Sequence, residues 1–121
     1  MATTKTVTVL DNNVTLTAGA GDHTSGVWDL QDGYGGTLHI KATNGATGPT
    51  LGSQSQVWVS PDNTNWYRLG GALLAALGNS IVSSWVVNIP IGIKWAEVIS
   101  GSNTGQNVTI RVEGSEVVAL A

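Results

Sequence analysis

The sequence predicts an all-β domain, a sandwich or barrel of about eight to ten short antiparallel strands. Hydrophobic residues alternate with polar ones at a period of two along much of the chain, which is the pattern of a half-buried strand. Clusters of Gly, Asn, Asp, Ser and Pro interrupt these runs about every 8–12 residues, as tight turns require. The 121 residues fit one domain, 1–121, because domains commonly hold about 100–150 residues.

The alternating runs define the expected strands in order along the chain. Val7 and Val9 alternate with threonines in the first run, and Leu38 and Ile40 alternate with polar residues in the fourth. Pro90 ends another run because it lacks the N–H that a ladder needs. The expected strands are 5–10, 13–18, 26–31, 36–43, 54–60, 65–69, 83–90, 94–100, 106–113 and 115–119.

One apolar segment fits the strand pattern less well. Residues 71–78 contain three leucines between glycines and could form a turn or two of helix, which is too short to be stable alone in water. Leu73, Leu74 and Leu77 in this segment are candidates for a contact patch, because an apolar run on a connection is costly to leave in water. The alternative is that the segment is a buried short strand or a plug in the core.

Composition limits the classes of function. Only 11% of the residues are charged, less than half of the roughly 25% typical of soluble domains. This favours a surface that a partner covers, with a Thr- and Ser-coated sheet as the alternative. The cations Lys5, Lys41, Arg68, Lys94 and Arg111 are scattered, which argues against nucleic-acid binding. No apolar stretch is long enough to span a membrane, no export signal is visible, and the lack of cysteine excludes disulfides.

The residues that carry chemistry are too few to predict an enzyme. His23 lies in a Gly-rich turn and His39 on the polar face of a strand, and both are expected to be solvated surface side chains. The Asp clusters at 29–33 and 62–65 have turn spacing, so turn hydrogen bonds explain them without a metal ion. No acid, base and nucleophile can be combined, and we expect neither catalysis nor a cofactor.

Tryptophan gives the clearest signal of a binding surface. Strand parity places Trp28 and Trp85 on apolar faces, as core residues. Trp58 and Trp95 fall on the opposite, polar faces of their strands and are predicted to point outward. Outward tryptophans are candidates for an interface, since aromatic residues are enriched where proteins bind. The alternative is that a loop covers them or that both faces of the sheet are buried.

The segment Val57–Leu69, VWVSPDNTNWYRL, resembles the V-x-V-S-x-D-G-x-N-W-Y-x-L hairpin of small virion proteins of tailed bacteriophages. Asn63 stands where glycine is more usual, and 73–77 departs from the Gly- and Thr-rich loop of that family. Further segments that resemble the family are 16–21, 26–29, 34–38, 43–50, 85–90, 92–95 and 101–106.

The resemblance implies an antiparallel jelly-roll-like β-sandwich on the capsid exterior. Such a protein is a capsid decoration or cement protein, made in the host cytoplasm and carried on the virion. Its partners are the major capsid protein and its own copies, with a homotrimer expected.

Two rival functions remain open at this point. The chain is similar in its 60–66 turn to sugar-binding jelly-rolls, and Trp58 with Gln54 and Gln56 would form the stacking site of a lectin-like carbohydrate-binding module. A tail or baseplate subunit of a phage would use the same fold for assembly.

Overall fold

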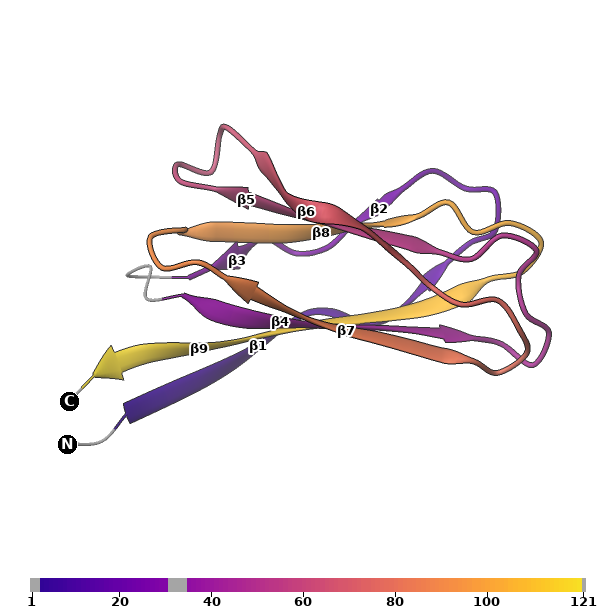
Figure 1. Cartoon of the computed structure of the whole chain (residues 1–121), viewed down its shortest axis with the longest axis horizontal. Helices are drawn as coiled ribbons and strands as arrows, with labels where there is room; N and C mark the ends of the chain where they lie inside the picture. Colours follow the sequence, from indigo (N-terminus) through magenta and orange to yellow (C-terminus); the bar gives the residue numbers. More distant parts are fainter. Residues whose placement is uncertain (1–2, 31–34, 121) are drawn as a thin grey trace.

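Two antiparallel sheets lie face to face in the computed structural model, which describes residues 3–30 and 35–120 (Figure 1). The described residues form nine strands and no helix, and hence no helix that could cross a membrane. The strands are β1 (Thr3–Leu16), β2 (His23–Thr24), β3 (Trp28–Asp29), β4 (Gly36–Asn44), β5 (Gln54–Ser60), β6 (Tyr67–Leu74), β7 (Val82–Ile89), β8 (Trp95–Gly101) and β9 (Val108–Leu120). The end of the expected strand 26–31 and the turn at 32–34 lie outside the described residues.

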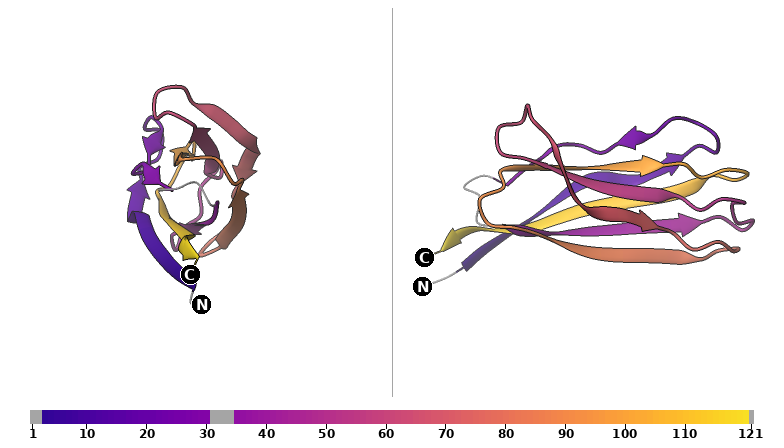
Figure 2. Two further views of the ribbon diagram at one scale, coloured as in Figure 1. Left: turned by 90° about the vertical axis from the view of Figure 1, so that its left-hand side faces the viewer. Right: turned by 45° about the horizontal axis from the view of Figure 1, so that its top comes forward.

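The strand order is that of a jelly roll. Sheet A has the order β1-β9-β4-β7, and sheet B has the order β2-β8-β5-β6, with β3 also paired to β8. Successive strands therefore alternate between the sheets over most of the chain, as they do in two interleaved Greek keys. Figure 2 shows the two layers end on, with β6 and β7 as edge strands on one side. The predicted class, an all-β jelly-roll-like sandwich, is confirmed.

The core lies between the two sheets and consists of the inward residues of both. Trp28 comes from sheet B and is 1% exposed. Its indole lies against Gly36 and Gly114 of sheet A, where an added Cβ would stand 2.7 and 2.5 Å from ring carbons. The other buried hydrophobic residues are Leu16, Leu30, Leu38, Ile40, Ala42, Val57, Val59, Ile89, Ala96, Val98, Val108, Ile110 and Val112. Trp85 packs against this core from β7, as its parity predicted.

Strand boundaries differ from the prediction where the structure joins neighbouring runs. The runs 5–10 and 13–18 form the single strand β1, and 106–113 joins 115–119 in β9. The register between β1 and β9 shifts at three places, and two of these lie between Val9 and Val14, where the two expected runs of β1 join. Each shift can exchange the inward and outward faces of the strand.

The first run faces the opposite way from the one that its alternating valines suggest. Val7 and Val9 are 63% and 46% exposed, whereas Thr6, Thr8 and Leu10 are half-buried. A buried face formed by the valines would be wrong, because they lie on the parity opposite to Leu10 and Leu16, which face the core.

Candidate interaction surfaces

The outer face of sheet B carries the two tryptophans that parity placed outward. Trp58 and Trp95 are both half-buried, while Val57 and Val59 on the opposite face of β5 are buried in the core. Trp95 faces away from the core for the same reason, since its neighbour Ala96 is fully buried. Neither tryptophan is sealed inside the protomer, and both keep part of their surface exposed.

Polar groups surround Trp58 on this face. In the strand register, Trp58 stands between Glu97 of β8 and Arg68 of β6. Its Nε1 donates a hydrogen bond to Oε1 of Gln56 at 3.3 Å, which helps to fix the ring. Partial burial raises the pKa of Glu97 above its ordinary value. The outer face around Trp58 therefore combines an indole ring with charged and hydrogen-bonding groups.

The predicted sugar-stacking set is brought together on the same face. Gln54, Gln56 and Trp58 occupy alternate positions of β5, and all three are half-buried. Gln54 stands opposite Leu74 of the neighbouring strand, at the end of the sheet away from Trp58. The side-chain oxygen of Gln56 already accepts a hydrogen bond from the indole of Trp58.

The leucine segment is strand and loop rather than helix. Strand β6 continues to Leu74, and the connection to β7 follows it. Leu73 stands opposite Ser55 and packs against the core, so it does not belong to a surface patch. Leu74 and Leu77 are 67% and 56% exposed. The structure thus separates the predicted trio into one half-buried and two exposed leucines.

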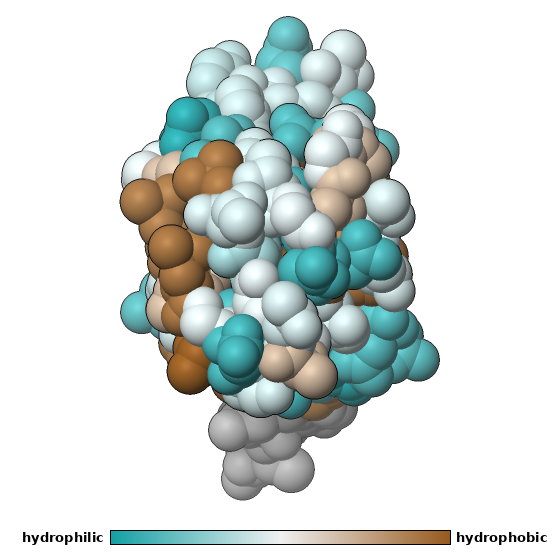
Figure 3. Space-filling view, turned by 90° about the vertical axis from the view of Figure 1, so that its right-hand side faces the viewer, coloured by the Kyte–Doolittle hydropathy of each residue, from teal (hydrophilic) through white to brown (hydrophobic). Residues whose placement is uncertain are grey.

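Two further residues join Leu74 and Leu77 on the surface. Ile81 and Val82 are exposed at the end of the same connection, and Figure 3 shows apolar side chains gathered along one flank of this end of the molecule. We call Leu74, Leu77, Ile81 and Val82 the apolar end patch. Sequence reasoning missed Ile81 and Val82. Val82 could have been found, because it continues the outward parity of Ser84 and Val86 in β7.

The connection that carries the patch is held by specific hydrogen bonds. The side chain of Asn44 donates through Nδ2 to the carbonyl oxygens of Ala76 and Gly78, at 3.0 and 2.9 Å. The amide of Asn44 also donates to the carbonyl of Ile81 at 2.9 Å. Asn44 is itself buried, so the connection is anchored to the end of β4. The leucines are therefore exposed by a fixed backbone rather than by a loose loop.

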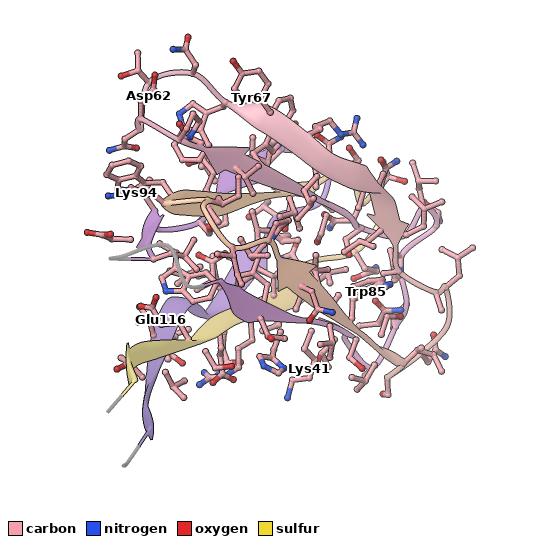
Figure 4. All side chains as sticks on the ribbon, turned by 60° about the vertical axis from the view of Figure 1, so that its left-hand side comes forward. Lys41, Asp62, Tyr67, Trp85, Lys94 and Glu116 are labelled. Atoms are coloured by element: carbon pink, nitrogen blue, oxygen red, sulfur yellow. The ribbon has the colours of Figure 1, made fainter. Side chains whose placement is uncertain are left out.

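Asp62 organises the turn between β5 and β6, which Figure 4 shows at the tip of the hairpin. Its Oδ1 accepts from the amides of Thr64 and Asn65 at 2.9 and 2.8 Å, and its Oδ2 accepts from Nδ2 of Asn65. These hydrogen bonds lower the pKa of Asp62 to about 2. Asn63 takes φ 60°, a left-handed conformation that asparagine tolerates in place of glycine.

The two histidines differ in their burial and in their partners. His39 is exposed on the outer face of sheet A, as expected. His23 was expected to be solvated, but it is half-buried and its Nε2 lies 2.8 Å from Oδ1 of the buried Asp11. The prediction for His23 was wrong because β2 pairs with β8, which brings this turn against β1. Among the described residues, no group of three His, Cys, Asp or Glu side chains could hold a metal ion.

Comparison with known proteins supports the fold. No family model and no curated protein sequence matches the chain. The structure of infectious bursal disease virus, Gx strain, is similar with a TM-score of 0.58 and 8% identity, over 93% of this chain and 31% of that one. The enzymatically active domain of tailspike protein 4 of bacteriophage CBA120 is similar with a TM-score of 0.53 and 15% identity, over 94% of this chain and 19% of that one.

A carbohydrate-binding module has the same fold as well. CBM29_1, a family 29 module from Piromyces equi, is similar with a TM-score of 0.51 and 13% identity, over 92% of this chain and 90% of that one. At these identities the likeness shows a shared jelly-roll-like sandwich, a fold that serves many functions.

Proposed function

We propose that this chain is a structural protein of a bacteriophage virion, a capsid decoration or cement protein that binds the capsid exterior and its own copies. Its role is binding and assembly rather than catalysis. The observation that carries the proposal is the apolar end patch, in which leucine and β-branched side chains stand exposed on a rigidly held connection.

The hydrophobic effect favours an apolar patch that a partner covers over one that stays exposed to water. An exposed apolar surface of this kind typically marks a site of protein association. The low content of charged residues, 11%, removes much of the repulsion that would oppose packing between copies. We assign the patch to contacts between copies of the chain, with a trimer favoured.

The outer face of sheet B supplies a second surface, which we assign to the shell. Its tryptophans lie half-buried among Gln, Glu and Arg side chains, and interfaces of non-obligate partners combine aromatic anchors with polar groups in this way. The partner proposed for this surface is the major capsid protein. The resemblance to small phage virion proteins and the viral and phage structures with the same fold support this choice.

Imaging the particle that carries the chain tests the proposal. Cryo-electron microscopy is expected to show copies of the jelly roll on the outside of the capsid, with the apolar end patches of neighbouring copies in contact. Density at the tail or baseplate instead would contradict the capsid assignment and favour the tail subunit.

Carbohydrate binding is the second candidate function, favoured by the alignment of Gln54, Gln56 and Trp58 on one outer face. Tryptophan rings stack on sugar rings, and amides bond to their hydroxyls. Binding of the isolated protein to a glycan array, lost in Trp58→Ala, would support this candidate. For the capsid protein, the array is expected to show no binding that depends on Trp58.

A further inference from the structure

A depression of about 240 Å³ lies on the outer face of sheet A, and its lining residue Ser84 follows Val82 of the apolar end patch by two positions in β7. Three neighbouring strands line it with side chains that alternate outward. They are His39 and Lys41 of β4, Ser84 and Val86 of β7, and Arg111 and Glu113 of β9. Figure 4 shows Lys41 projecting from this face, on the side opposite the β5–β6 hairpin that carries Asp62.

Two like charges face each other in this depression. Lys41 stands directly opposite Arg111 in the register of β4 and β9. Such a cross-strand pair destabilises a sheet, and the chain has only five Lys and Arg residues to place. Glu113 offsets one charge, since its Oε1 accepts from Nε of Arg111 at 2.9 Å. Lys41 is exposed and forms no ion pair within the described part of the chain.

The remaining groups offer both donors and acceptors. Arg111 also donates to Oδ1 of Asn12 at 2.6 Å, which fixes its guanidinium and leaves its other N–H groups available. The hydroxyl of Ser84 and the ring of His39 can each donate or accept. Val86, 67% exposed, forms an apolar wall beside them.

The size and chemistry of the depression select its ligand. Its volume lies below the roughly 300 Å³ at which sites for drug-sized molecules begin, which suits a ligand the size of one sugar ring. A free ammonium group attracts a carboxylate, whereas Ser84, His39 and Glu113 suit hydroxyl groups and Val86 suits the C–H face of a ring. The carboxylate of an acidic peptide would use only the hydrogen-bond donors of the depression and would leave its acceptors and Val86 without a contact.

We infer that this depression binds an acidic sugar, with the carboxylate of a uronic-acid type residue held by Lys41 and Arg111. The inference goes beyond the proposed function, because it assigns to sheet A a glycan contact that neither the apolar end patch nor the tryptophan face makes.

Titration of the ¹⁵N-labelled full chain, followed by NMR, tests this inference. Methyl β-glucuronide is expected to shift the amide signals of Lys41, Ser84, Val86 and Arg111, and methyl β-glucoside, which lacks the carboxylate, is expected to leave them unchanged. High salt should weaken the binding several-fold, because exposed charges are screened. Equal binding of the two sugars, or shifts confined to sheet B, would overturn the inference.

Matched variants test which lysine charge the binding of methyl β-glucuronide depends on. Lys41→Met should reduce the affinity for methyl β-glucuronide by about tenfold or more, since a charge-assisted hydrogen bond is lost. Lys94→Met removes the same charge from an exposed site outside the depression and should bind like the wild type. Ser84→Ala, which keeps every charge, should weaken binding several-fold and serves if Lys41→Met fails to fold. Equal losses in the two lysine variants, or tighter binding of a glutamate hexapeptide at the same residues, would contradict an acidic-sugar site.

Discussion

Single side chains decide the conformation of the β5–β6 turn. Asp62 accepts hydrogen bonds from two backbone amides and the side chain of Asn65, and it needs its negative charge to accept them all. The sequence predicted turn hydrogen bonds for this cluster, because Asp and Asn at turn spacing bond to nearby amides. The structure adds the reason for Asn63, which supplies the left-handed residue of the turn.

Acid should weaken the fold through Asp62. The pKa of Asp62 is lowered in the folded state from 3.8 to about 2, so the carboxylate contributes stability above pH 3.8. That contribution is lost as the pH falls from 3.8 to about 2. Asp62→Asn should therefore be less stable than the wild type at neutral pH and should lose less stability across this range. Thermal unfolding measured from pH 7 to pH 2 checks this, and parallel profiles for the two proteins would contradict it.

Strand parity predicted the inward or outward orientation of some side chains correctly and failed for others, for a physical reason. The outward orientation of Trp58 and Trp95 followed from regular alternation in β5 and β8, where the β5–β8 register is continuous. Val7 and Val9 were misplaced because they lie on the parity opposite to Leu10 and Leu16, which face the core. His23 could not be paired with Asp11 from sequence, since the contact joins two separate segments.

At the scale of elements, the packing of β3 against sheet A explains one glycine at the start of β4 and one in the interior of β9. Glycine weakens a strand and often marks a close approach. Here the indole of Trp28 occupies the space in which side chains at Gly36 and Gly114 would lie. The sequence placed Trp28 in the core but could not identify the glycines it packs against, because they lie on strands far away in the chain.

Gly114→Ala should destabilise the protein. The added Cβ would come within 2.5 Å of a Trp28 ring carbon, which forces the indole or the strand to shift. Overpacking of this kind costs about 1–3 kcal/mol. Gly71→Ala is the matched control, because nothing lies within 4 Å of its added Cβ. Urea unfolding of both variants measures the difference, and equal stabilities would show that the core accommodates the methyl group.

The leucine segment shows where element boundaries escape prediction. A short apolar run between glycines has no clear period, so helix, buried strand and surface patch remained open. Strand β6 continues through it because Ser55 and Gln54 of β5 provide partners for Leu73 and Leu74. The pairing orients Leu73 toward the core and Leu74 outward, a distinction that only the register supplies.

Over the whole molecule, the apolar end patch adjoins the other two surfaces, since Leu74 stands opposite Gln54 of sheet B and Val82 precedes Ser84 by two positions in β7. The apolar end patch occupies one end of the sandwich, the tryptophans lie on the outer face of sheet B, and the charged depression lies on the outer face of sheet A. The jelly roll was predictable as a whole, since alternation and turn spacing extend over the entire chain, whereas the end patch required three-dimensional placement.

Association of copies through the apolar end patch can be tested by measuring the mass of the protein in solution. Light scattering coupled to size exclusion should show an oligomer for the wild type and a monomer for Leu74→Asp, with an unchanged β-sheet circular dichroism spectrum. Burial of a leucine contributes about 1.5–3 kcal/mol, so replacing it by a carboxylate should weaken association by about 100-fold or more. Ile91→Asp, at a site 80% exposed but outside the patch, should remain oligomeric. A monomeric wild type, or the same oligomer in Leu74→Asp, would contradict the account.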